Sequence, residues 1–170
     1  MEIKKAPGKY WRIRCGLQYY SEALRLCRKY AGTASSVLEV GARDTLFLEK
    51  LDWIPRKVAI DRRMVPVING AENIRSDFLT WQEPYLFDLA VCLQVLEHLK
   101  NVITFAEKLK KCCRILIVSV PYKWPYGRCR GHQQDPIDLP KLMGWFEQVP
   151  IEYRIINDAD SARLIAVFVV

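Results

Sequence analysis

From residue 36 onward, short runs of apolar and β-branched residues alternate with longer stretches whose apolar positions recur every three or four residues. This alternation is typical of βαβ units, in which helices join parallel strands. The strand-like runs are mostly apolar along their whole length, which indicates strands buried on both faces of a sheet. We predict five parallel strands, at residues 36–40, 57–60, 73–76, 88–92 and 114–120.

Helices are predicted between and before these strands, at residues 17–31, 45–53, 98–110 and 138–147. In the first of them Leu24 and Cys27 follow helical spacing, and Gly32 would end the helix. Two further strand-like runs, 151–157 and 162–170, flank a turn-like DADS and predict a hairpin. The expected fold class is α/β, with a doubly wound, Rossmann-like sheet of about seven strands. Most strands would be parallel, with the last strand antiparallel in the terminal hairpin.

Composition limits what the chain can be. Hydrophobic residues make up 51% of the 170 positions and charged residues 26%, which is the balance of one globular domain. We expect a single domain over 1–170, with a basic N-terminal arm and helix at 1–32 and the core at 33–170. No run approaches the roughly 20 uncharged apolar residues of a membrane span. The N-terminus has charged and aromatic residues where a signal peptide has an apolar core, so we expect a cytoplasmic protein.

The net charge of +7 is concentrated near the N-terminus. Residues 1–30 carry eight Lys or Arg against two Glu, whereas residues 31–170 carry eighteen basic against seventeen acidic residues. A nucleic-acid-binding domain would spread positive charge over one face of the fold, so the pattern argues against such a partner. The basic arm is either a solvated helix surface or a contact for an acidic partner. The oligomeric state stays open.

Candidate chemistry lies directly after the predicted strands, where open α/β sheets bind their ligands. Glu39 and Gly41 end the first strand, and Gly41 permits a positive φ or a close backbone approach. Asp61 ends the second strand, 22 residues beyond Glu39, at the spacing of an acidic residue that accepts hydrogen bonds from ribose. Asp77 follows the third strand. Each acid taken singly is also explained as a helix cap or turn residue.

The strand ends carry a family resemblance. The segments VLEVGARD, VAIDRR, IRSDFLTW, FDLAVCLQVLEHL and ILIVSVPY resemble class I S-adenosylmethionine-dependent methyltransferases in order and spacing, over about residues 33–170. LQVLEHL is similar to the fourth-strand motif of the small-molecule branch. The later VPYKWPYGRCRGHQQDPIDLPKLMGWF is similar to bacterial members associated with sugars or polysaccharides. The resemblance implies a seven-stranded sheet whose last strand is antiparallel.

The same resemblance implies S-adenosylmethionine as cofactor and gives each strand end a role. It places Glu39 and Gly41 against the methionine part of the ligand and Asp61 on the ribose hydroxyls. Asp77 and Phe78 would contact the adenine through its amine and its ring face. Gln94 would lie beside the transferring methyl group.

The chain departs from the family in the glycine-rich loop. The second and third glycines of the family motif are replaced by Arg43 and Thr45. Arg43 would either pair with the carboxylate of the cofactor or obstruct the site. The resemblance therefore leaves two functions open. One is a methyltransferase that acts on a small molecule or saccharide, by O-methylation. The other is an inactive, methyltransferase-like scaffold that contacts an acidic partner through its basic arm.

The loop after the fifth strand is the predicted acceptor site. His132 is the candidate general base, with Asp135 three residues on as the carboxylate that orients it. His98, beside Glu97 at a predicted helix start, is interpreted as a structural histidine. Aromatic side chains in and after the loop offer faces on which an acceptor would stack, or cover the sheet edge: Tyr122, Trp124, Tyr126 and Trp145.

Other site chemistries fit the sequence poorly. An NAD-linked dehydrogenase would need G-x-G-x-x-G after the first strand, and this chain has one glycine there. Methyltransferases that modify nucleic-acid bases usually have N/D-P-P-Y/F after the fourth strand, where this chain has LQVL. Cys129 and His132 lie near Cys112-Cys113 in sequence, but adjacent cysteines do not reproduce the usual zinc ligand spacing. We therefore predict no metal site.

Overall fold

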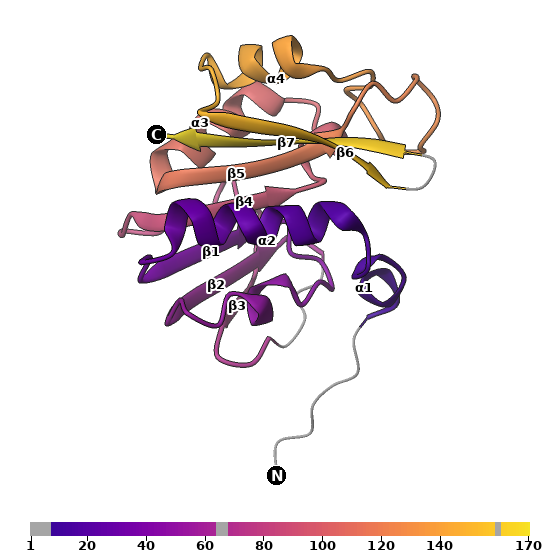
Figure 1. The fold of residues 1–170 in the computed structure, drawn as a ribbon. Coiled ribbons are helices and arrows are strands. Elements are labelled where there is room, and N and C mark those ends of the chain that lie inside the picture. Colours follow the sequence, from indigo (N-terminus) through magenta and orange to yellow (C-terminus); the bar gives the residue numbers. More distant parts are fainter. Residues whose placement is uncertain (1–7, 64–67, 159–160) are drawn as a thin grey trace.

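The computed structural model describes residues 8–63, 68–158 and 161–170, which form an α/β fold around one seven-stranded sheet (Figure 1). The strand order across the sheet is β3-β2-β1-β4-β5-β7-β6. The strands are β1 (Ser36–Val40), β2 (Arg56–Asp61), β3 (Glu72–Arg75), β4 (Phe87–Leu93), β5 (Cys113–Pro121), β6 (Glu152–Asp158) and β7 (Ser161–Val169). All seven predicted strands are present, and their ends differ from the prediction by at most one residue.

Strand direction confirms the mixed sheet. The first five strands are parallel, whereas β7 is antiparallel to both of its neighbours, β5 and β6. The strand order reverses at β1, which pairs with β2 on one side and β4 on the other. In such a sheet the loops that follow the two central strands leave toward opposite faces, and a crevice opens between them. The ends of β1 and β4 are therefore where a ligand site is expected.

Helices cover both faces of the sheet (Figure 1). One face packs against α2 (Gln18–Ala31), preceded by the short α1 (Lys9–Arg14), and against the 3-10 helix η1 (Phe47–Lys50). The other face packs against α3 (Val102–Cys112) and α4 (Leu139–Phe146). Alternate strand residues serve the two layers: Val37 lies in the α2 layer and Leu38 in the α3 layer, as the two-residue period of a strand requires.

Three of the four predicted helices are present, although α3 begins at Val102, four residues later than predicted, so that His98 does not lie at its start. Residues 18–31, 102–112 and 139–146 are helical, and Asp138 caps the last of these by accepting from the Lys141 N–H at 3.0 Å. The helix predicted at 45–53 is wrong, because only η1 forms there. The loop that follows β1 uses residues 41–46, and Pro55 disfavours a helical conformation at the residue before it. Little chain is left for a full α-helix.

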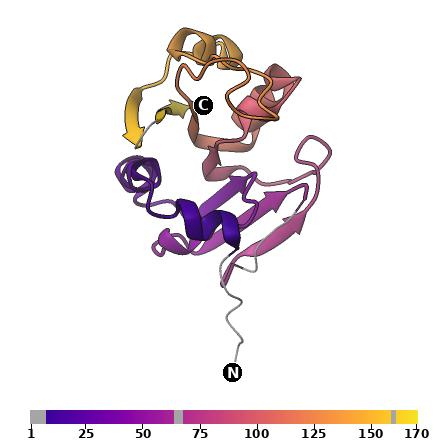
Figure 2. The same ribbon diagram turned by 90° about the vertical axis from the view of Figure 1, so that its right-hand side faces the viewer.

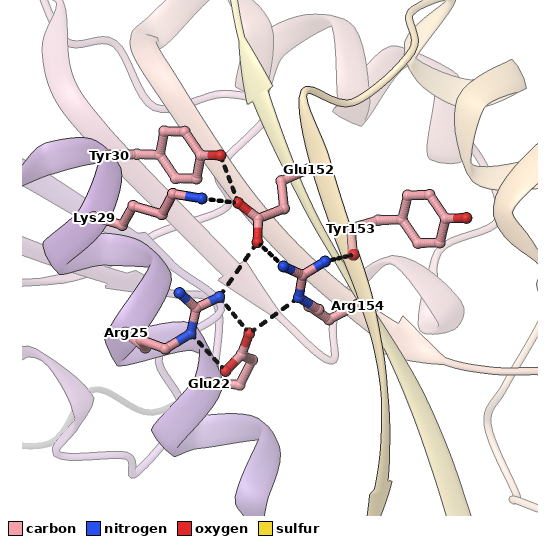
Figure 3. A network of polar contacts seen from close by, with 7 residues as sticks. All are labelled: Glu22, Arg25, Lys29, Tyr30, Glu152, Tyr153 and Arg154. Atoms are coloured by element: carbon pink, nitrogen blue, oxygen red, sulfur yellow. Dashed lines mark hydrogen bonds and ion pairs between the residues drawn. The ribbon is translucent and has the colours of Figure 1, made fainter.

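A polar network ties α2 to the edge strand β6 (Figure 3). Glu152 of β6 accepts hydrogen bonds from Lys29 and Tyr30 at 2.5 Å each, and these bonds lower its pKa to about 2. Arg25 also reaches Glu152, at 3.3 Å, and pairs with Glu22 on its own helix at 2.7 Å. Two of the basic side chains near the N-terminus are therefore paired within the chain. The basic residues among positions 1–7, Lys4 and Lys5, lie outside the described residues.

The helix α1 is a feature that the sequence pattern did not predict. It covers six residues and buries Trp11 against Tyr20 of α2, with ring centroids 4.9 Å apart. This short helix places the N-terminal segment beside the loop that follows β1.

Among the residues described, no helix has the length and hydropathy that a membrane crossing requires.

Candidate functional site

The carboxyl ends of the parallel strands meet at one edge of the sheet, on the right-hand side of Figure 1 and facing the viewer in Figure 2. In the loops that directly follow β1 and β4, three described residues have a left-handed backbone: Gly41 (φ 79°), Arg43 (φ 49°) and Gln94 (φ 59°). Such conformations are costly for residues other than glycine and gather at functional sites. The geometry therefore marks the ends of β1 and β4, where the strand order reverses.

Gly41 holds the loop after β1 close to the turn after β4. Its N–H donates to the Ile60 carbonyl at 2.8 Å, which continues the pairing of β1 with β2. A Cβ at this position would lie 2.3 Å from Cγ2 of Val95, well inside van der Waals contact. The position therefore requires glycine twice, for its positive φ and for the close approach of Val95.

Arg43 replaces a family glycine but keeps a glycine-like backbone. Its N–H donates to Oδ2 of Asp61 at 3.0 Å. Its guanidinium lies 4.4 Å from the ring centroid of Tyr10, in α1. The side chain is exposed and stacks on the N-terminal helix. The arginine is therefore accommodated by the loop conformation and by α1.

Glu39 is the buried acid of this loop. The hydroxyl of Thr45 donates to its Oε1 at 2.7 Å, whereas Oε2 is buried without a hydrogen-bond partner in the described part of the chain. Burial raises the pKa of Glu39 to about 8, and the nearby Asp61 adds to this effect. Thr45, at the second departure from the family motif, thus has a definite contact inside the site. A cationic ligand group beside this oxygen would favour the ionised carboxylate and donate a hydrogen bond to it.

The predicted ribose and adenine contacts lie at successive strand ends. Asp61 accepts from the backbone N–H groups of Arg43 and Arg63, at 3.0 and 2.7 Å. Asp77 accepts from the Leu79 N–H at 2.9 Å and so stabilises a turn. Phe78 is buried and packs 4.9 Å from the ring of Phe105. Phe78 thus serves the core of the α3 layer, and its predicted contact with adenine stays a prediction.

Asp44 is a site residue that the sequence did not single out. Its Oδ2 accepts from the Tyr10 N–H at 3.1 Å, which attaches the start of α1 to the loop after β1. A cavity of about 480 Å³ opens here, lined by Gly8, Lys9, Tyr10, Ile13, Arg14, Arg43 and Asp44. A larger cavity of about 570 Å³ lies near the amino ends of β4 and β5, between residues 79–86 and α3. Only the first of these two cavities adjoins the strand ends.

Gln94 follows β4 and points toward β5. Its N–H donates to the Ser119 carbonyl at 2.9 Å, and its Nε2 donates to the Ser119 hydroxyl at 3.2 Å. These contacts hold the left-handed Gln94 in place beside the loop after β1. The residue predicted to lie near the transferring methyl is therefore rigidly positioned at the strand-order reversal.

The loop after β5 folds back onto the 3-10 helix η2 (Leu96–His98). Its Gln133 N–H donates to the Glu97 carbonyl at 2.7 Å, and its Gly131 carbonyl lies 3.1 Å from Nδ1 of His98. Glu97 itself is buried, and burial raises its pKa to about 8. Burial lowers the pKa of His98. This docking could not be predicted from the sequence, because Gln133 and Glu97 are 36 positions apart.

His132 and Asp135 are brought together by this loop. Nδ1 of His132 lies 2.6 Å from Oδ2 of Asp135, and both side chains are buried. Trp124 stacks on the imidazole, with ring centroids 5.7 Å apart and planes 19° from parallel. His98 meets the same imidazole edge to face at 4.7 Å. The two histidines of the chain thus lie side by side at the predicted acceptor end of the site.

Comparisons with known proteins concern the fold. No protein-family model matches the sequence, and no curated protein is significantly similar to it. The N-methyltransferase NodS from Bradyrhizobium japonicum WM9, solved with S-adenosyl-l-homocysteine, is similar with a TM-score of 0.71 and 22% identity. That match covers 89% of this chain and 85% of NodS.

Two other solved structures have the same architecture. The 1,6-didemethyltoxoflavin-N1-methyltransferase of Burkholderia thailandensis, with bound 1,6-didemethyltoxoflavin and S-adenosylhomocysteine, has a TM-score of 0.75 and 15% identity, and the match covers 98% of this chain and 91% of that one. Magnesium protoporphyrin IX methyltransferase from Synechocystis PCC 6803 has a TM-score of 0.67 and 14% identity, with coverage of 89% and 82%. The chain therefore has the fold of S-adenosylmethionine-dependent methyltransferases.

Proposed function

We propose that the chain is an S-adenosylmethionine-dependent methyltransferase that methylates a hydroxyl group of a small molecule or saccharide. The observation that carries the proposal is the pairing of two carboxylates at adjacent strand ends. Glu39 is the last residue but one of β1 and has a buried oxygen without a hydrogen-bond partner among the described residues, and Asp61 ends the neighbouring β2. The loop between them is left-handed at Gly41 and Arg43.

The residues at these strand ends fit the cofactor. The unpaired Oε2 of Glu39 suits an ammonium group such as that of the methionine part. Asp61 offers charged oxygens to the two ribose hydroxyls, and Asp77 would accept from the adenine amine. Bound here, the cofactor would supply an electrophilic methyl group on its sulfonium. The protein then has to align the acceptor and provide for its proton.

The acceptor end is proposed at Gln94 and the loop after β5. Asp135 engages Nδ1 of His132, so Nε2 is the atom at which this imidazole would take the proton of an acceptor hydroxyl. Trp124 gives the imidazole a fixed plane. A hydroxyl needs such proton removal, whereas an amine does not, and this difference supports oxygen as the methylated atom.

Ligand binding tests the proposal directly. We expect isothermal titration calorimetry with millimolar S-adenosylhomocysteine to show saturable heat, and the same ligand to raise the melting temperature. NAD at the same concentration serves as the control and should do neither, because the loop has one glycine in place of a pyrophosphate-binding motif. Absence of binding would overturn the proposal and favour the inactive scaffold.

Transfer of a labelled methyl group tests the acceptor class. Mono- and oligosaccharides, other small hydroxyl compounds and matched amines are offered as acceptors together with labelled S-adenosylmethionine. We expect label on hydroxyl compounds. Label only on amines would retain the methyltransferase and overturn O-methylation.

A further inference from the structure

A compact group of potential metal ligands lies at the acceptor end of the site. One carboxylate oxygen of Glu97 and one imidazole nitrogen each of His98 and His132 lie within 4.8 Å of one another. Glu97 and His98 belong to η2, whereas His132 comes from the loop after β5. The docking of that loop onto η2 is what brings the three side chains together.

Both imidazoles have one nitrogen already engaged. Nδ1 of His132 is held by Asp135 at 2.6 Å, and Nδ1 of His98 lies 3.1 Å from the Gly131 carbonyl. Each contact makes Nδ1 the protonated nitrogen and leaves the lone pair on Nε2. Histidines that bind metals almost always have such a carboxylate or carbonyl on their other nitrogen. The tautomers required for metal binding are thus set by the fold.

The buried carboxylate of Glu97 is the third potential ligand. Its side chain is 1% exposed, and its Oε2 has no hydrogen-bond partner among the described residues. Its Oε1 lies 3.9 Å from Nε2 of His98, a separation that one ion between them would bridge. A buried carboxylate oxygen without a partner costs free energy unless a cation or donor meets it.

We propose that Glu97, His98 and His132 bind one divalent transition-metal ion. Two imidazoles and one carboxylate suit Zn²⁺, Mn²⁺ or Fe²⁺ better than Mg²⁺, which prefers oxygen ligands. Three protein ligands leave further coordination positions open. The side chain of His98 is 46% exposed, so those positions face the solvent side of the acceptor loop. The prediction of no metal site considered cysteines, and none of the three ligands is a cysteine.

This ion would determine which class of acceptor binds, an inference that rests on the proposed function. An acceptor with two neighbouring oxygens, such as a vicinal diol, would chelate the ion at its open positions. The ion would acidify a bound hydroxyl, as it does bound water, and the proton would leave to solvent. Nε2 of His132 would then be a metal ligand, and proton uptake by the free imidazole would no longer be needed.

Metal binding is tested without cofactor or acceptor. We expect chelator-treated full-length protein to bind one equivalent of Zn²⁺ or Mn²⁺ by calorimetry, with Mn²⁺ binding also visible by electron paramagnetic resonance. His98→Gln, at a half-exposed position, should weaken binding at least about 100-fold. Asp135→Asn should weaken it by about 10–100-fold, because it loosens the orientation of His132. Glu97→Gln keeps the shape of the buried side chain and should also abolish tight binding.

Two controls separate this site from other sources of binding. Cys129→Ser tests a cysteine site in the same loop, and Glu49→Gln tests exposed carboxylates, since Glu49 lies on the surface of η1. Both variants should bind as the parent does. Binding that is lost in Cys129→Ser, or that persists in folded His98→Gln, would overturn the proposal. Binding of S-adenosylhomocysteine is measured separately, so failure of the metal site and failure of the methyltransferase are distinguished.

Discussion

The backbone N–H of Arg43 donates to Oδ2 of Asp61 at 3.0 Å, so the residue that replaces a loop glycine is bonded to the predicted ribose acceptor. The left-handed backbone of Arg43, at φ 49°, makes this bond possible. The bond couples the shape of the loop to the position of the carboxylate. Arg43 therefore helps to hold β1, its loop and β2 in one arrangement.

Asp61→Ala should weaken binding of S-adenosylhomocysteine by roughly 1.5–3 kcal/mol, about tenfold or more. The variant removes a charged acceptor for two hydroxyls and the partner of two backbone N–H groups. Urea unfolding should show a folded protein that has lost about 1–2 kcal/mol of stability. Asp61→Asn keeps an acceptor for the Arg43 N–H, so its affinity for S-adenosylhomocysteine should lie between those of the parent and Asp61→Ala. Parent-like affinity in Asp61→Ala would show that this carboxylate does not hold the ribose.

Gly41→Ala should lower the free energy of unfolding by more than about 2 kcal/mol, through a positive φ and a clash with Val95. Gly70→Ala is the matched control, because Gly70 has a similar φ of 72° and nothing within 4 Å of an added Cβ. It should cost only the strain, about 1–2 kcal/mol. Urea unfolding of both variants measures the difference. Equal losses would mean that Val95 yields freely to the added methyl group.

Glu39→Gln should change how stability depends on pH. Burial raises the pKa of Glu39 from 4.5 to about 8. Between these values the folded protein keeps a proton that the unfolded chain has released, so stability falls as pH rises. The slope for one proton is about 1.4 kcal/mol per pH unit. The variant lacks this loss, so its stability relative to the parent should increase by about 2–3 kcal/mol between pH 5.5 and 7.5. A constant difference across that range in urea unfolding would contradict a neutral Glu39.

His132→Ala should lower methyl transfer to a hydroxyl acceptor by about 10²–10⁴-fold and leave affinity for S-adenosylhomocysteine within about twofold. His132 lies in the loop after β5, and its bonded partner Asp135 comes from the same loop. Arg130→Ala, at an exposed position of the same loop, is the control and should retain activity. Loss of cofactor affinity in His132→Ala would indicate that the loop supports the whole site.

The strands of the sheet could be predicted from the sequence because a buried strand is a continuous run of apolar residues. Strands such as β1 are buried on both faces, so their apolar runs stand out against the polar turns around them. Glycine at position 41 and acids at positions 39 and 61 come at the ends of those runs, which is why these candidate cofactor residues could be assigned to strand ends from the sequence. The prediction at residues 45–53 was wrong because the loop after β1, stabilised by contacts with β2 and α1, extends to residue 46, and only the four residues of η1 are helical in the rest of that segment.

Contacts between segments that are distant in the sequence could not be predicted in this way. His98 and His132 are 34 positions apart, and the role of His98 beside His132 depends on how residues 122–138 fold back onto η2. Asp44 and Tyr10 likewise meet across 34 positions. Hydrophobic periodicity reports whether a residue is buried, but not which side chain it meets. The grouping of Glu97, His98 and His132 therefore depends on the tertiary structure, in which backbone hydrogen bonds hold the loop after β5 against η2.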